Sequence, residues 1–372
     1  MRAVVVHDSD ALGRSARRMV LGAGLECRGD DYIPFDSLER RLAAGDTAVI
    51  VVRIGKNQRQ AVELAARAAS LSQGPVFAVG KLDDPTLIGQ VQAAGATHLE
   101  SETAMQTEFE TAVDSLSQSR QSARQRGRLI SVFGPTAGSG ATTLAVNLAG
   151  ALASWYPQGV ALAEMGRTVA DIPLRLDVKA DVGTNDICRR WEQLDSTSLE
   201  AGLARRDPGL RILAHNQADD EHYDDDPMHP AAVRRVGILM RSNFPYAVWK
   251  LDAQLDEECL ESIRLSDCVL LVIRPDVLCV RRAQAARRLM ESHGIDRAKL
   301  QLIVNRWGQP GQLTRRQIES TLDAKIFHQI ADDPKVANRA LNRGALFVEA
   351  GKASPATKAI AKLAKKLDQH FS

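Results

Sequence analysis

The sequence lacks the features that mark a secreted, membrane-spanning or disulfide-bonded protein. Its 372 residues contain no apolar run of membrane-spanning length, and the opening MRAVVVHDSD has no charged-then-apolar signal layout. The five cysteines are scattered without CxxC spacing, which argues against a disulfide framework or a metal knuckle. These absences predict a protein of the reducing cytoplasm.

An excess of charge of one sign is also lacking. Lys and Arg nearly balance Asp and Glu, and the formal net charge is +2 at pH 7. Nothing in the overall charge therefore points to nucleic acid or to an acidic substrate. The length leaves room for two or three domains, each with its own core.

Residues 128–156 have the pattern of a phosphate-binding loop. They read RLISVFG, PTAGSGATT and LAVNLAGALASWY: an apolar strand candidate, a small-residue loop and a helical segment. Glycines in such a loop let backbone N–H groups turn toward an anion, and the helix N-terminus adds a favourable dipole. Thr142 keeps the hydroxyl of the GxxxxGK[ST] consensus, but Ala141 replaces its lysine. A purely structural turn is the alternative.

Apolar runs alternate with helical segments along most of the chain, which predicts α/β domains with parallel sheets covered on both faces. We expect one domain over residues 1–112, a Ser-, Gln- and Arg-rich linker over 113–127, and a second domain over 128–372. The linker is expected to be solvated; contact of its arginines with RNA or lipid is the alternative.

In the first domain the strand candidates are Ala3–Val6, Ala48–Val52, Val76–Val79 and Thr97–Leu99, and the helix candidates are Asp10–Leu21, Ser37–Ala44, Arg59–Ser70, Pro85–Ala94 and Thr103–Leu116. In the second domain the strand candidates are Leu129–Phe133, Gly159–Ala163, Leu210–Ala214, Ala247–Leu251, Cys268–Ile273 and Leu300–Val304, with a short one near Ile326.

The element order of the first domain and its segment GATHLES resemble a response-regulator receiver domain, a flavodoxin-like fold. The resemblance implies an acidic pair, a phosphate-accepting Asp, a Ser or Thr and a Lys, where this chain has His7-Asp8, Arg53, Gly80 and Glu100. Arginine cannot accept a phosphoryl group, and one carboxylate holds Mg²⁺ poorly. We therefore expect a pseudo-receiver that binds partners. A flavodoxin-like domain without signalling ancestry is the alternative.

The run GSGATTLAVNLAGALA resembles the GGxGKTTxAxNLAxALA motif of the MinD/ParA group, the deviant Walker ATPases. In that group a second, signature lysine opens the motif and reaches the nucleotide of the partner subunit. Its position here is Thr136, so both lysines are absent. The resemblance implies nucleotide binding by a degenerate loop made of Gly134, Thr136, Gly138, Ser139, Gly140, Ala141, Thr142 and Thr143.

Later segments also resemble this group. VLLVIRPDVLCVRRAQAARRLM, LQLIVNRWG and KIFHQIADDP match its strands and loops, which implies that Asn305, Arg306 and Pro334 face the base of a nucleotide. Within the group the chain resembles the Tad/Flp pilus assembly family called TadZ or CpaE. Those proteins join an atypical receiver to a MinD-like domain.

The resemblance also shows where catalytic groups are missing. The VDLDxxxxD pattern of the family becomes VALAEMG, with Glu164 at the first carboxylate and Gly166 at the second, and Lys250 stands at the Walker B aspartate. Asp252 lies two residues on, too far along the strand to replace that aspartate without a bulge. Phosphoryl transfer depends on Mg²⁺ and cationic side chains. We therefore expect a pseudo-ATPase with no catalytic residue and no metal ligand.

Two arrangements are open for Lys250. It substitutes for the metal ion by pairing with Glu164 or with a bound anion, or it extends to solvent past Trp249 and leaves the site empty. Weakly bound ATP or ADP is the expected cofactor, with little support for Mg²⁺.

Three further segments have less specific patterns, and each pattern allows two interpretations. The acidic run Ala218–Pro230 is expected to be a surface loop rather than a metal site. The amphipathic segment 356–371 is expected to pack on its sheet, with weak or indirect membrane contact as the alternative. Trp191 within Arg189–Leu194 is expected in a core or dimer interface rather than in a binding patch.

The expected function is a non-catalytic scaffold that localises or regulates a Tad/Flp pilus or related secretion machine. We expect a homodimer whose partners are pilus or secretion-machine proteins, such as a secretion ATPase or polar factors. It would work in the cytoplasm, at a pole or at the inner face of the membrane. The alternatives are an atypical, weakly hydrolysing ATPase switch and a DNA-partitioning ParA relative. The near-neutral charge disfavours the last, and no nucleic acid partner is expected.

Overall fold

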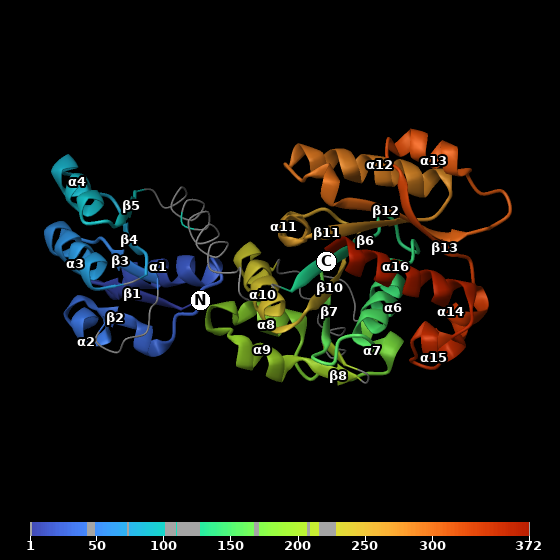
Figure 1. The fold of residues 1–372 in the computed structure, drawn as a ribbon, viewed down its shortest axis with the longest axis horizontal. Helices are drawn as coiled ribbons and strands as arrows, with labels where there is room; N and C mark the ends of the chain where they lie inside the picture. Colours follow the sequence, from blue (N-terminus) through green and yellow to red (C-terminus); the bar gives the residue numbers. More distant parts are fainter. Residues whose placement is uncertain are drawn as a thin grey trace. The chain divides into compact units, whose positions relative to one another are not determined.

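The structure, a computed structural model, describes residues 2–42, 49–72, 74–100, 109, 127–166, 171–206, 209–215 and 228–371. The chain divides into two compact units, Met1–Gln125 and Arg126–Ser372. Each unit is an α/β structure with its own sheet (Figure 1).

The N-terminal unit has a five-stranded parallel sheet in the order β2-β1-β3-β4-β5. This is the strand order of flavodoxin-like folds. Every residue of β1 and β3 is buried, as expected for a sheet covered by helices on both faces. The strands are β1 (Ala3–His7), β2 (Tyr32–Pro34), β3 (Val49–Arg53), β4 (Val76–Val79) and β5 (Thr97–Leu99), and the helices are α1 (Asp10–Gly22), α2 (Leu38–Leu42), α3 (Gln58–Leu71) and α4 (Pro85–Ala93).

Strand β2 is absent from the expected elements. It has only three residues, too few for a visible alternation, and it ends in Pro34, which cannot donate to a strand ladder. Its place at the edge of the sheet makes the proline tolerable. The helix expected over Thr103–Leu116 lies outside the described residues except for Phe109, whose ring lies 4.9 Å from that of Phe77.

The C-terminal unit has an eight-stranded sheet in the order β13-β12-β11-β6-β10-β7-β9-β8. The neighbouring strands are parallel except that β8 runs antiparallel to β9. The strands are β6 (Arg128–Phe133), β7 (Val160–Met165), β8 (Ala204–Arg206), β9 (Leu210–Leu213), β10 (Tyr246–Leu251), β11 (Cys268–Ile273), β12 (Leu300–Trp307) and β13 (Ile326–Ala331). The helices are α6 (Ala141–Ala153), α7 (Asp171–Leu176), α8 (Thr184–Arg189), α9 (Ser196–Gly202), α10 (Pro230–Asn243), α11 (Glu257–Leu265), α12 (Val277–Ser292), α13 (Arg315–Leu322), α14 (Pro334–Leu341), α15 (Phe347–Gly351) and α16 (Pro355–Phe371).

Each expected strand of this unit is present, with ends shifted by a few residues, and β8 is added at the edge. The largest shift is in β12, which continues past Val304 to Trp307. Its pairing with β13 is irregular between Val304 and Trp307, and Arg306 has a positive φ of 52°. The Asn305-Arg306 pair therefore lies in a bulge, which can turn a side chain away from the regular strand direction.

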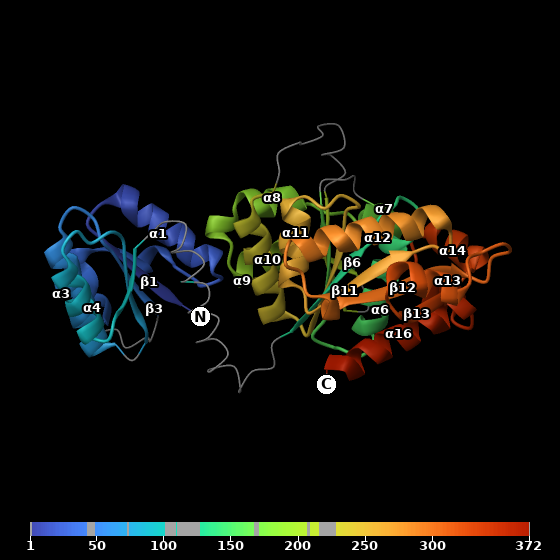
Figure 2. The same ribbon diagram turned by 90° about the horizontal axis from the view of Figure 1, so that it is seen from above.

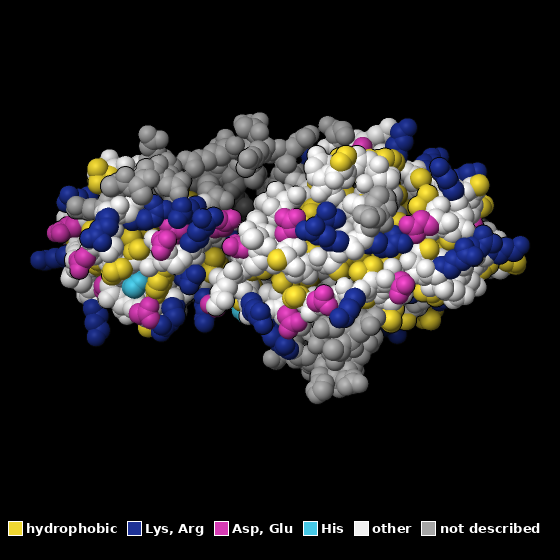
Figure 3. Space-filling model, turned by 90° about the horizontal axis from the view of Figure 1, so that it is seen from below, with side chains coloured by type: hydrophobic (Ala, Val, Ile, Leu, Met, Phe, Trp, Pro, Cys, Tyr) yellow, Lys and Arg dark blue, Asp and Glu magenta, His cyan; other side chains and the backbone are white. Residues whose placement is uncertain are grey.

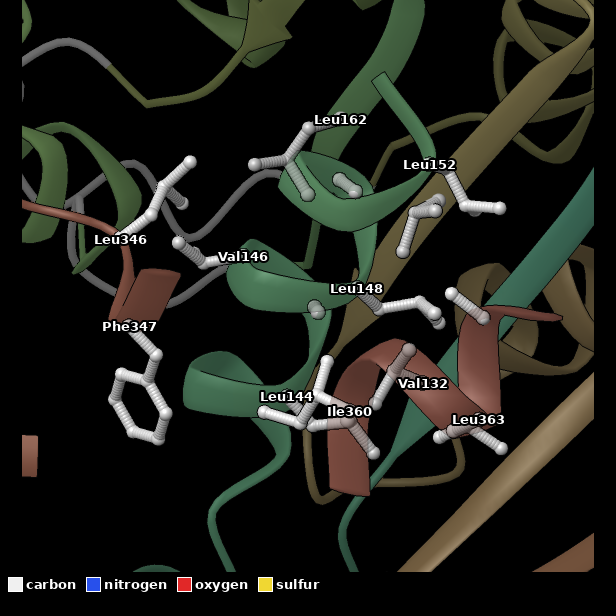
Figure 4. Packing of buried hydrophobic residues seen from close by; sticks show 14 of the residues in the cluster. Val132, Leu144, Val146, Leu148, Leu152, Leu162, Leu346, Phe347, Ile360 and Leu363 are labelled. Carbon is white, nitrogen blue, oxygen red and sulfur yellow. The ribbon is translucent and has the colours of Figure 1, made fainter. Parts of the chain in front are cut away.

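Helices cover both faces of this sheet, with α6 and α16 on one side and α11 and α12 on the other (Figures 1 and 2). Tyr246 and Val248 of β10 join the core cluster beneath α6, whereas Trp249 points the opposite way, to Met240 of α10. Helix α6 is apolar around most of its circumference, and Figure 4 shows it enclosed by other packed side chains. This burial fixes the first turn of α6, where the glycine-rich loop ends.

The apolar side of α16 faces the core rather than solvent. Leu363 and Leu367 are fully buried, in the same cluster as Leu148 and Leu152 of α6. Figure 4 shows Leu363 among these side chains. The expectation of packing is therefore confirmed, and this face is not available for membrane contact. No described helix combines the length and hydrophobicity that a membrane crossing requires.

Of the other weak segments, Trp191 is buried and its ring stacks on His229 at 5.8 Å, in line with the core reading. Most of the acidic run Ala218–Pro230 lies outside the described residues. Basic and acidic side chains are interspersed on the face shown in Figure 3.

Candidate functional site

The glycine-rich loop joins β6 to α6 at the carboxyl end of the sheet. The strand ends at Phe133, and α6 begins at Ala141 directly after Gly140. Gly138 and Gly140 have φ values of +74° and +96°, a left-handed conformation that glycine adopts without strain. The predicted strand, small-residue loop and helix are thus present.

Asn305 fixes the second half of this loop. Its Nδ2 donates to the carbonyl oxygen of Ser139 at 2.9 Å, and a Cβ placed on Gly140 would overlap that same amide group. Asn305 is expected from its motif to face a base. In the structure its amide nitrogen binds the loop, and the residue also lines the adjacent pocket.

Thr136, at the signature-lysine position, fixes the first half of the loop. Its Oγ1 lies 3.2 Å from Sγ of Cys279, in the first turn of α12. The backbone N–H of Arg274 donates to the same sulfur at 3.3 Å. Thr136 therefore connects the loop to a helix of the same unit.

A pocket of about 260 Å³ opens beside the loop. It brings together the three expected base-facing residues, Asn305, Arg306 and Pro334, with Gly140 and Thr143. The remaining loop residues, Gly134, Thr136, Gly138, Ser139, Ala141 and Thr142, lie outside its lining.

Asp333 lines the pocket and Arg175 contacts Thr143 of its wall, and no motif assigns a role to either residue. Asp333 caps α14 by accepting from Val336 N through Oδ1, while its buried Oδ2 has no hydrogen-bond partner among the described residues. Arg175 of α7 donates from Nη1 to Thr143 Oγ1 at 3.3 Å. An N-cap aspartate before proline reads as ordinary helix capping, and α7 has no motif, so the sequence offered no signal for either role.

Lys250 lies at the carboxyl end of β10, directly opposite Glu164 of β7 in the strand register. Its Nζ is 3.0 Å from Asp252 Oδ1 and 3.8 Å from Glu164 Oε1, with only 9% of the side chain exposed. Extension to solvent past Trp249 is therefore wrong, and pairing is the observed arrangement. Asp252 takes part by binding the ammonium without occupying the Walker B position.

The Glu164 carboxyl is completely buried, and this controls its protonation. Burial raises its pKa to about 7, and the attraction of Lys250 offsets only part of that effect. Oε1 accepts a hydrogen bond from Asp171 N at 3.2 Å, while Oε2 has no hydrogen-bond partner among the described residues. Asp252 is therefore the closer partner of Lys250.

These groups do not fit a divalent cation. Mg²⁺ needs oxygen ligands in octahedral geometry, commonly one or two carboxylates. Here both nearby carboxylates are engaged by an ammonium group, which would repel the metal. The loop and the pocket do suit the phosphates and base of a nucleotide, because backbone donors and a concave, partly polar wall are both present.

In the N-terminal unit the receiver positions converge at the carboxyl ends of the strands. The Arg53 side chain is buried there and donates from Nη1 to the Val79 carbonyl at 2.7 Å. A Cβ on Gly80 would lie 2.5 Å from that nitrogen, so a serine or threonine at this position does not fit beside Arg53. The guanidinium thus occupies the region where receiver chemistry would need a carboxylate and a hydroxyl.

At the position of the acidic pair, the His7 side chain packs against a second ring. The His7 ring lies 4.3 Å from that of Tyr32, and burial lowers the pKa of His7. Asp8 accepts a hydrogen bond from Asn57 N at 3.4 Å. Glu100 follows β5, as expected.

Known proteins resemble this chain in structure rather than in sequence. No protein-family model matches it, and a search of curated proteins finds no match. Among solved structures, a ParA family ATPase from Chlorobium tepidum is 19% identical with a TM-score of 0.60, over 65% of this chain and 99% of that one. The septum site-determining protein MinD from Pyrococcus horikoshii, complexed with Mg-ADP, is 20% identical with a TM-score of 0.54, over 66% and 97%.

A third similar structure is the MinC:MinD complex of Aquifex aeolicus, at 21% identity and a TM-score of 0.53, over 65% of this chain and 96% of that one. The matched share of this chain agrees with the length of the C-terminal unit. The C-terminal unit has the MinD/ParA fold. Identities this low establish the architecture and leave the activity to be argued from this chain's own residues.

Proposed function

We propose that this protein is a non-catalytic scaffold built on the MinD/ParA fold. The observation that carries the proposal is the ammonium of Lys250, 3.0 Å from Asp252 and 3.8 Å from Glu164, where a Walker B aspartate would serve Mg²⁺. Phosphoryl transfer relies on a metal ion and on cations aimed at the phosphates. Both loop lysine positions hold uncharged residues, Thr136 and Ala141, so the loop aims no lysine at the phosphates.

The protein still binds ATP or ADP, but weakly. The pocket beside Gly140 and Thr143, with Asn305, Arg306 and Pro334 in its wall, receives the base of ATP or ADP. The loop's backbone donors meet the phosphates. The MinD of Pyrococcus horikoshii, a similar structure, is complexed with Mg-ADP.

The proposed role is to localise or regulate assembly of a Tad/Flp pilus or related secretion machine, as TadZ/CpaE-like proteins do. The C-terminal unit forms a homodimer, and the N-terminal unit, residues 1–112, acts as a pseudo-receiver that recruits machine proteins. Support comes from the flavodoxin-like strand order and from the buried Arg53, whose side chain cannot accept a phosphoryl group. A MinD in complex with a second protein, MinC, is a structural precedent for partner binding.

The deciding test is MgATP hydrolysis by the purified full-length chain. We expect turnover at background, and no rescue by Ala141→Lys, because the metal position stays filled by Lys250. Turnover above background that is lost in Thr142→Ala would instead support an ATPase switch. Light scattering with and without ADP tests the dimer; a monomer at every concentration and condition would contradict that part of the proposal.

A further inference from the structure

The charges around the glycine-rich loop come from parts of the chain outside the loop motif. Arg274 follows β11, and its Nη1 would lie 3.8 Å from a Cβ placed on Gly138. The side chain is 29% exposed, so a ligand on the loop can reach it. Its Nε pairs with Asp276 at 3.1 Å, which leaves the far end of the guanidinium at the loop.

A second guanidinium, that of Arg175, contacts the first turn of α6. Arg175 donates to Thr143 Oγ1 at 3.3 Å, and its buried Nε has no hydrogen-bond partner among the described residues. Arg274 and Arg175 therefore approach the loop from different elements, one at Gly138 and one at the start of α6. Guanidinium groups are always charged and match phosphate oxygens through two parallel donors.

The metal position already holds a positive charge. The Lys250 ammonium bridges Asp252 and Glu164, so the two carboxylates are compensated without a divalent ion. A metal brought in with a nucleotide would meet this ammonium, which already contacts both carboxylates. The charge that Mg²⁺ supplies in an ordinary P-loop is here divided between a fixed lysine and two arginines.

We propose that this site binds the phosphate groups of a nucleoside di- or triphosphate free of divalent metal, with Arg274 and Arg175 contacting the phosphates. This rests on the proposed nucleotide binding and specifies its ligand as the metal-free anion. Free Mg²⁺ then competes with the arginines for the phosphates and weakens binding, the reverse of the usual dependence.

The experiment is calorimetric titration of the full-length chain with ADP, ATP and inorganic triphosphate, in EDTA and again in excess Mg²⁺. We expect tighter binding in EDTA than in excess Mg²⁺, and equal binding under the two conditions would contradict the competition. Arg274→Gln should weaken binding about tenfold or more, the usual loss for a charged hydrogen bond. Arg282→Gln, an exposed arginine on α12, is the matched control and should change affinity less than about twofold.

Arg274→Gln removes a partly exposed group, so the variant should fold, and its melting temperature checks this. Binding seen only with Mg²⁺ would overturn the inference, as would absence of binding under both conditions or equal losses in Arg274→Gln and Arg282→Gln. None of these results affects the non-catalytic scaffold, which MgATP turnover alone decides. MgATP hydrolysis together with tight metal-free binding would contradict the non-catalytic function and still support metal-free nucleotide binding.

Discussion

The carboxylate of Asp252 lies in the space that a side chain on residue 166 would occupy. A Cβ placed on Gly166 would overlap that carboxylate, so glycine is the residue that fits. In the resembled family this position carries an aspartate at the end of the β7 strand. Here the carboxylate comes from Asp252, the residue directly after the neighbouring strand β10, and it is bound to Lys250 at 3.0 Å. A carboxylate is therefore present beside residue 166, but it is paired with a lysine.

Restoring the family's carboxylate should therefore harm the fold. Gly166→Asp is expected to lower the free energy of unfolding by about 1–3 kcal/mol, because the new side chain overlaps Asp252. Urea unfolding followed by tryptophan fluorescence measures this in the C-terminal unit, which contains all four tryptophans. Adding Asp252→Ala should recover part of the loss, since space is freed and the new carboxylate can pair with Lys250. Strictly additive losses would contradict the overlap.

Lys250→Met should be strongly destabilising. It leaves Glu164 and Asp252 together with no cation at 3.0–3.8 Å, and breaking a buried pair in this way costs about 3–5 kcal/mol. Glu164→Gln in the same chain should reduce the loss, because one of the two carboxylates is removed. A double-mutant cycle by denaturant unfolding gives the coupling, expected at about 1 kcal/mol or more. Coupling within error of zero would mean that the two residues do not interact.

Stability should depend on pH through Glu164. Its pKa is raised from 4.5 to about 7 by burial, so the folded state binds more protons than the unfolded state between these values. The contribution of this group is complete below about pH 4.5 and is lost as pH rises through about 7. Relative to Glu164→Gln, the wild type should lose up to about 3 kcal/mol between pH 5 and 8. A constant difference between the two proteins across that range would refute the shift.

The N-terminal unit should not be phosphorylated by acetyl phosphate. The buried Arg53 donates to Val79 O at 2.7 Å and excludes a side chain at Gly80, so neither the acceptor nor the hydroxyl of a receiver is available. Mass spectrometry of treated protein should find no added phosphate on residues 1–112. A stable phospho-aspartate there, at Asp8 for example, would show that phosphorylation survives.

Much of the fold could be predicted because it depends on local patterns. Apolar runs such as Cys268–Ile273 and the glycine-rich segment before α6 encode buried parallel strands and a strand-to-helix turn in short stretches of sequence. The edge strands β2 and β8 are not predicted, because each has only three residues, too few to show an alternating apolar pattern. A strand at the edge of a sheet is also less buried and therefore needs fewer apolar residues.

The candidate site likewise has features that local sequence predicts and features that depend on contacts between distant segments. The missing charges could be predicted from short motifs, since Thr136, Ala141 and Lys250 stand at motif positions. The contacts that these residues make depend on the packing of distant segments. Lys250 lies opposite Glu164 because β10 pairs with β7 in this register. Arg274 lies near Gly138 because β11 pairs with β6. Neighbours across a parallel sheet are set by strand order and register, which no short segment encodes.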